Sequence, residues 1–64
     1  MDMRSIRRFL NLRLTDVERA TGIAAARISE AERGLTRLTR AEERAVKNFL
    51  QMKLAGTLNS EAIE

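Results

Sequence analysis

The sequence predicts a single all-α domain over residues 1–64, folded as a compact bundle of four to five helices. The 64-residue chain contains no proline and only two aromatic residues, and its β-branched residues never cluster, so strands are not expected. Apolar residues recur three and four positions apart, as they do on one face of a helix. Glycines at positions 22, 34 and 56 separate these apolar runs and predict the helix ends.

The first helix is expected from about Met3 to Leu10. Met3, Ile6 and Leu10 are spaced so that they share one face, and Phe9 widens that face. Asn11 follows, and asparagine is second only to glycine at left-handed helix ends, so the helix is expected to stop there.

The second helix is expected to begin near Thr15 and to stop at Gly22. Thr15 and Glu18 have the spacing of a capping box, in which each side chain accepts a hydrogen bond from an unpaired amide of the first turn. Asp16 also lies in this turn, where the helix dipole favours a negative charge. The third helix is expected from residue 24 or 25 to residue 33, ending at Gly34.

The longest helix is expected last. Residues 35–38 form a connector with Leu35 and Leu38 as apolar anchors, and Thr39 with Glu42 forms a second capping box. An apolar face then continues to about Lys53, and glycine 56 closes the helix. Its members are Ala45, Val46, Phe49, Leu50 and Leu54. Residues 57–64 are expected either to fray or to pack on a partner.

Composition excludes several classes of function. The chain has no cysteine and no histidine, so disulfides, thiolate metal sites and the usual nucleophile–base pairs cannot form. We therefore expect a protein that is not an enzyme and that uses no metal, cofactor or small-molecule ligand. No segment resembles a membrane span or a signal peptide, so a soluble, cytoplasmic protein is expected.

Charge points to a partner. The chain has twelve basic residues, ten of them arginine, against nine acidic ones. Three of the acids lie at the chain ends (positions 2, 61 and 64), so residues 3–60 carry twelve positive and six negative charges, a net charge of +6. A basic body favours a polyanionic partner, and the planar arginine side chain suits phosphate and guanine. The alternative is an arginine-rich surface that is merely solvated.

Three segments carry a resemblance to a known family. They are LRLTDVERATGI at 12–23, RISEAERG at 27–34 and LTRAEE at 38–43. Their spacing resembles the helix-turn-helix family of Cro and the lambdoid phage repressors (the xenobiotic-response-element class), over residues 3 to about 54. The resemblance implies a bundle of the lambda-repressor-like DNA-binding type, with the helix-turn-helix at about 15–33.

The resemblance also implies structural roles. Arg7 matches the position of an arginine that pairs with the glutamate of the family's Glu-Arg-Gly-like segment, so we expect Arg7 to pair with Glu32. A small core is expected where the two motif helices meet, built from Val17, Ile23, Ile28 and Ala31. Glu18 departs from the alanine that is usual in the family, and we expect it to turn back and cap its own helix at Thr15.

In this family the second motif helix enters the major groove. The matching base-contact positions are Ala24, Ala25, Ala26, Arg27, Ser29 and Glu30. The three alanines depart from the Gln, Ser or Thr that the family often has at these positions. Alanine cannot form a hydrogen bond with a base edge, and its methyl group can contact only the methyl group of thymine. Hydrogen bonds with bases must then come from Arg27, Ser29 and Glu30. Arg27 suits guanine, and Glu30 suits the amine of cytosine. The alternative is that the alanines only allow the helix to approach the DNA closely, and that sequence specificity arises from other features.

Phosphate contacts are implied at the start of the first motif helix and in the loop before the last helix. The matching residues are Arg13, Thr15, Arg33, Arg37 and Arg40, with Arg4 and Arg8 extending the positive rim.

We therefore expect a sequence-specific DNA-binding regulator, a phage or bacterial repressor that binds double-stranded DNA as a homodimer and is associated with the nucleoid. Residues Met52, Leu54, Leu58 and Ile63 are the expected dimer interface. The alternative is a small helix-turn-helix module that binds protein, as an antitoxin-like or anti-repressor subunit. Glu30 and the alanines favour this alternative, whereas the arginines favour DNA.

Overall fold

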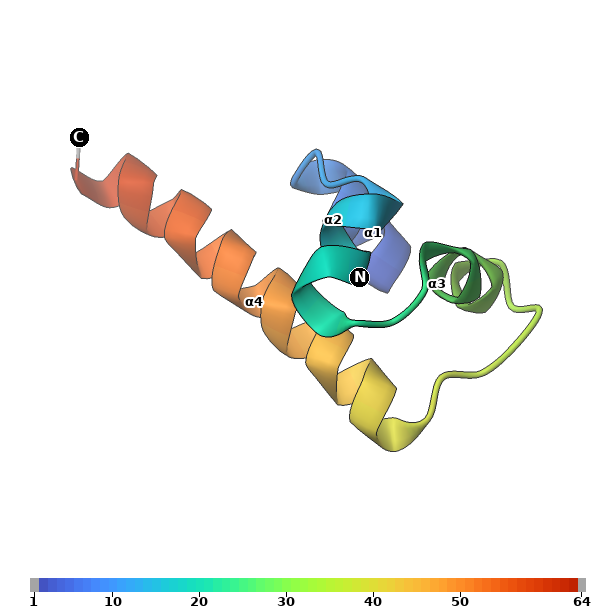
Figure 1. Cartoon of the computed structure of the whole chain (residues 1–64). Helices are drawn as coiled ribbons and strands as arrows, with labels where there is room; N and C mark the ends of the chain where they lie inside the picture. The colour runs from blue at the N-terminus through green and yellow to red at the C-terminus, as the bar shows by residue number, and fades with distance from the viewer. Residues whose placement is uncertain (1, 64) are drawn as a thin grey trace.

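The computed structural model describes residues 2–63, with side chains described for residues 2–57. Its four helices are α1 (Met3–Phe9), α2 (Leu14–Thr21), α3 (Ala25–Glu32) and α4 (Arg40–Ile63), and residues 2–63 contain no strand. The all-α prediction is confirmed, with four helices. Figure 1 shows that α1, α2 and α3 gather beside the first half of α4, whose second half extends away from them, and the molecule measures 41 × 19 × 18 Å.

The core lies where the first three helices meet α4. Its buried side chains are Val17, Ile23, Ile28, Val46 and Leu50. Half-buried side chains packed against them are Met3, Ile6, Leu10, Leu12, Leu14, Leu38 and Phe49. The expected apolar face of the first helix is therefore confirmed at Met3, Ile6 and Leu10. The small core expected between the motif helices is confirmed at its valine and two isoleucines, while Ala31 is half-buried.

Most of the expected helix ends are confirmed. Asn11, Gly22 and Gly34 have φ angles of 58°, 78° and 77°, the left-handed conformation that ends a helix. At the start of α4, Thr39 N donates to Glu42 Oε1 at 2.8 Å and Glu42 N donates to Thr39 Oγ1 at 3.1 Å, which is the expected capping box. None of the helices in the described part of the chain has the length and apolar character of a membrane span.

The expected capping box of Thr15 and Glu18 is wrong. Helix α2 begins at Leu14, and Arg13 N donates to the carboxylate of Asp16 at 2.8 Å. Because Asp16 stands three residues after Arg13, its short side chain reaches back to that amide and takes the capping role. Glu18 instead accepts a hydrogen bond from Ala25 N at 2.9 Å, so it caps α3 rather than its own helix.

Three further expectations are wrong. Gly56 does not end the last helix, which continues to Ile63, because a glycine inside a helix costs only about 1 kcal/mol when its neighbours favour helix. Phe9 is exposed, since Leu10 takes the core-facing place at the end of α1. Leu35 is exposed because the chain turns outward at Gly34, so only Leu38 anchors the connector.

Candidate nucleic-acid interface

A turn of three residues, 22–24, joins α2 to α3. Gly22 adopts a φ of 78°, which glycine reaches without the steric cost of a side chain. The Thr21 hydroxyl donates to Val17 O at 2.7 Å and accepts from Ile23 N at 3.2 Å, so one side chain links the end of α2 to the turn. Ile23 then enters the core. The angle between α2 and α3 is thereby fixed on both sides of the turn.

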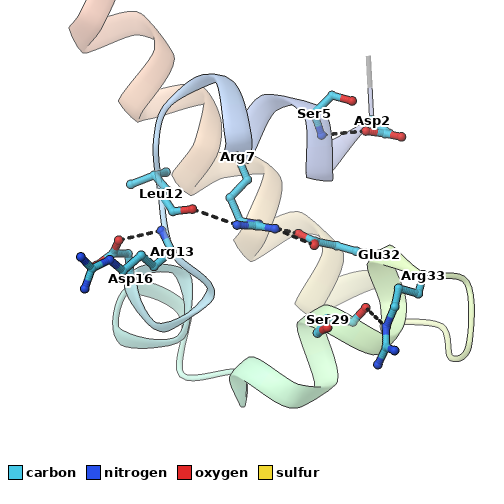
Figure 2. Close-up of polar contacts among 9 residues, drawn as sticks. All are labelled: Asp2, Ser5, Arg7, Leu12, Arg13, Asp16, Ser29, Glu32 and Arg33. Carbon is cyan, nitrogen blue, oxygen red and sulfur yellow. Dashed lines mark hydrogen bonds and ion pairs between the residues drawn. The ribbon is translucent and has the colours of Figure 1, made fainter.

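The pair between Arg7 and Glu32 is confirmed. Arg7 Nε donates to Glu32 Oε2 at 2.7 Å and Nη2 donates to Oε1 at 2.9 Å, while Nη1 donates to Leu12 O at 2.9 Å. Figure 2 shows the guanidinium between these two partners, linking α1, the α1–α2 turn and the end of α3. The side chains are only 12% and 5% exposed, and the pairing with Glu32 raises the pKa of Arg7.

Arg27 forms a second two-contact ion pair, which the sequence did not predict. Its Nε donates to Glu42 Oε2 at 3.0 Å and its Nη2 donates to Glu42 Oε1 at 2.8 Å. Together with the amide of Thr39, this contact lowers the pKa of Glu42 to about 2, the hydrogen bond from Arg27 being the largest cause. Arg27, which was expected to contact guanine, therefore has its guanidinium paired with a carboxylate at the start of α4.

Helix α3 is therefore tied to each of the other three helices by a polar contact. Glu18 of α2 holds its first amide, Arg27 joins it to Glu42 of α4, and Glu32 joins its last turn to Arg7 of α1. Its apolar anchor is Ile28, which is buried. The remaining surface of α3 takes part in none of these contacts.

The residues expected to contact bases lie on or next to this surface. Ala24, Ala26 and Glu30 are exposed, whereas Ala25 and Ser29 are half-buried. The two exposed alanines offer methyl groups, and Glu30 offers a carboxylate that forms no ion pair among the described residues. Apart from Arg27, the helix presents no side chain that donates strongly to a guanine.

The residues expected to contact phosphates are all exposed: Arg13, Thr15, Arg33, Arg37 and Arg40. Figure 2 shows Arg13 and Arg33 extending from opposite ends of the α2–α3 unit, away from the Arg7–Glu32 pair. Arg33 Nε makes a long hydrogen bond of 3.5 Å to Ser29 O. In the part of the chain described here, ion pairs engage Arg7, Arg27 and Lys47, so none of these four arginines is paired with an acidic side chain.

Two residues of this region were missed as site residues by the sequence. Asp16 caps α2 beside Arg13, and its spacing to Arg13 is a signal that was present in the sequence. Glu42 was expected to cap α4 but not to hold Arg27, which lies 15 residues earlier. No local pattern links residues that far apart on different helices.

The expected dimer residues fall into two groups. Met52 is 73% exposed on the extending half of α4. Leu54 is half-buried and lines a groove between α1 and α4 with Met3, Ile6 and Leu50. Leu58 and Ile63 lie outside the residues whose side chains are described. Among the described residues, no group of acidic side chains has an arrangement able to hold a metal ion.

No family model, curated protein or solved structure matches the chain.

Proposed function

We propose that the protein is a sequence-specific DNA-binding transcriptional regulator of the helix-turn-helix type, similar to Cro and the lambdoid phage repressors. It binds double-stranded DNA with α3 in the major groove, acts as a repressor at an operator, and binds as a homodimer on two half-sites about 34 Å apart. The tight α2–α3 turn and the exposed outer surface of α3 support this mode of docking.

One observation carries the proposal: the arginines just before α2, in the connector after α3 and at the start of α4 are exposed and form no ion pair among the described residues. Arg13 precedes α2, Arg33 and Arg37 lie in the loop after α3, and Arg40 begins α4. Arginines in this arrangement suit the phosphates on either side of a groove occupied by α3. Thr15 adds a hydroxyl beside Arg13.

Base recognition in this proposal relies on a mostly apolar helix surface. Ala24 and Ala26 present methyl groups that fit thymine methyls, and Glu30 accepts from a cytosine amine. Ala25 and Ser29 lie at the margin of the same surface. Specificity then depends on thymine positions and on the shape of the duplex more than on guanine contacts.

The salt dependence of duplex binding tests the proposal. Each neutralised phosphate releases counterions, so four arginine contacts per protomer, eight per homodimer, give a slope of the logarithm of the association constant against the logarithm of salt concentration of about −7. Arg40→Ala removes one contact from each protomer, so it is expected to make this slope shallower by about two and to weaken binding to all sequences alike. Arg19→Ala removes the same charge from an exposed position outside the proposed contacts and is expected to leave the slope unchanged. Binding that is absent, or insensitive to salt, would contradict the proposal.

A second candidate function is a protein-interaction module, as in an antitoxin-like or anti-repressor subunit. The observation that favours it is the carboxylate of Glu18 at Ala25 N. A negative charge there occupies the helix end that would otherwise attract a phosphate. Capture of a protein partner by a chain that fails to bind duplex DNA would move this candidate to first place.

A further inference from the structure

The ion pair between Arg27 and Glu42 connects two parts of the proposed interface. Arg27 lies on α3, next to the buried Ile28, and Glu42 lies in the first turn of α4. Between them runs the seven-residue connector 33–39, which carries Arg33 and Arg37. The first part of the connector is held to α3 by hydrogen bonds from Gly34 N and Leu35 N to backbone oxygens of α3, at 3.1 and 2.8 Å. Its second part is held by Leu38, packed against the core, and by the capping box of Thr39 and Glu42.

Glu42 gathers three hydrogen bonds on one carboxylate. Two come from Arg27, at 3.0 and 2.8 Å, and one from Thr39 N at 2.8 Å. Arg27 Nη2 also lies 3.5 Å from Arg37 O, in the connector itself. The guanidinium thus meets both the end of the connector and the beginning of α4, and its planar shape fixes the direction of approach.

We propose that Arg27 and Glu42 are positioning residues for DNA binding, which hold α3 and the Arg37–Arg40 segment in one fixed arrangement. This inference rests on the proposed function. A helix that enters the groove and arginines that bind the flanking phosphates contribute together only if their spacing is set before binding. Arg27 therefore acts through Glu42 and contacts neither a base nor a phosphate.

Two alternative roles for the pair predict different changes in duplex affinity and in its salt dependence. If Arg27 left Glu42 to bind a phosphate, its removal would reduce the salt slope. If Glu42 merely withheld Arg27 from DNA, removal of the Glu42 charge would tighten binding. If the pair positions the interface, neither result is expected. Loss of either residue then weakens binding in the same way, because both hold α3 and the Arg37–Arg40 segment together.

The test measures duplex affinity over a range of salt for the wild type, Arg27→Gln, Glu42→Gln and the double variant. Glutamine at position 42 keeps an amide oxygen for Thr39 N, so the cap of α4 is preserved while the ion pair is lost. We expect each single variant to lose about tenfold in affinity, the double variant to lose no more than either, and the salt slope to stay unchanged. Thermal melting in the same buffer verifies that each variant is folded.

The matched control is the pair Glu43–Lys47, an ion pair of 2.9 Å within α4 that joins no two elements. Lys47→Gln and Glu43→Gln are expected to leave duplex affinity nearly unchanged. The inference is overturned if Arg27→Gln makes the slope of the homodimer shallower by about two, if Glu42→Gln tightens binding, or if the two losses add. It is overturned as well if either single variant, being folded, keeps full affinity. A wild type that binds no duplex at any salt would instead reject the proposed function, and the inference with it.

Discussion

Arg7 and Glu32, 25 positions apart in the sequence, meet in two hydrogen bonds of 2.7 and 2.9 Å that tie α1 to the last turn of α3. Both side chains are nearly buried, and the third guanidinium nitrogen of Arg7, Nη1, donates to Leu12 O. The other polar ties of α3 join its first amide to Glu18 and Arg27 to Glu42.

Loss of either partner is expected to destabilise the fold. Arg7→Ala leaves the Glu32 carboxylate nearly buried without its cation, which costs about 3 kcal/mol. Glu32→Ala has a similar effect, and the double variant is expected to lose less than the sum. Urea unfolding followed by circular dichroism measures this. Lys47→Ala, in an exposed pair, is the control and should cost less than about 0.5 kcal/mol. Equal losses at positions 7 and 47 would contradict the account.

Stability is expected to fall in acid through Glu42. The pKa of this carboxyl is lowered from its ordinary value of 4.5 to about 2 by Arg27 and by the amide of Thr39. A group whose pKa is lower in the folded state stabilises the fold above its unfolded pKa and loses that contribution as pH falls through the folded pKa. The wild type should therefore lose stability between pH 4.5 and about 2.

The glutamine of Glu42→Gln cannot ionise, so this variant should lose less of its free energy of unfolding over the same pH interval. Urea midpoints measured as a function of pH compare the two proteins. Identical acid profiles would show that Glu42 does not carry this dependence.

The glycines at positions 22 and 56 are expected to respond oppositely to alanine. Gly22 has a φ of 78°, so Gly22→Ala should cost about 1 kcal/mol, and Gly22→Val more. Gly56 lies inside α4, and Gly56→Ala should stabilise the helix by up to about 1 kcal/mol. Apart from the adjacent residues and, at Gly56, the backbone of its own helix, no atom lies within 4 Å of the added Cβ at either site, so backbone conformation decides the sign. A thermal melt unchanged by Gly22→Val would rule out the turn as described.

The two capping boxes show how far the sequence could predict this fold. Thr39 and Glu42 form the expected box, because no nearer acid competes for the amide. Thr15 and Glu18 have the same spacing, but Asp16 takes the cap and the glutamate finds Ala25 N across the turn. Local patterns identified the helices and the helix ends at Asn11, Gly22 and Gly34. The choice between competing acceptors, in contrast, depends on distances between helices.

The candidate site shows the same division. The pair at positions 7 and 32 could be predicted because a family resemblance supplied it. The contact of Arg27 with Glu42 could not, since it depends on how the connector folds back on α3. Helix α4 passes through Gly56 for a related reason: a single glycine is a weak stop signal among residues that favour helix.

Thymine methyl groups are expected to contribute to operator affinity. Ala24 and Ala26 present exposed methyls on α3, and burial of one thymine methyl against them is worth about fourfold in affinity. Replacing thymine by deoxyuridine at single operator positions removes only that methyl, and fluorescence anisotropy measures the loss. Deoxyuridine outside the half-sites provides the control. If no position within a half-site responds, the alanines do not read thymine.

Self-association is expected to depend on the extending half of α4. Met52 is 73% exposed there, and a charged residue at its place should weaken a dimer that buries it by about ten- to a hundredfold. Sedimentation equilibrium of Met52→Glu and the wild type measures the dissociation constant, with the exposed Gln51→Glu as the control for charge alone. A wild type that stays monomeric at every concentration, alone and on DNA, would remove the homodimer from the account.

Selection from a random duplex library at near-physiological salt, followed by sequencing of the bound pool, shows whether the protein recognises a specific DNA sequence. We expect an enriched palindrome whose half-sites lie one helical turn apart, with thymines where α3 meets the groove. Recovery without an enriched sequence would contradict specific recognition, and no recovery of duplex at all would contradict DNA binding itself.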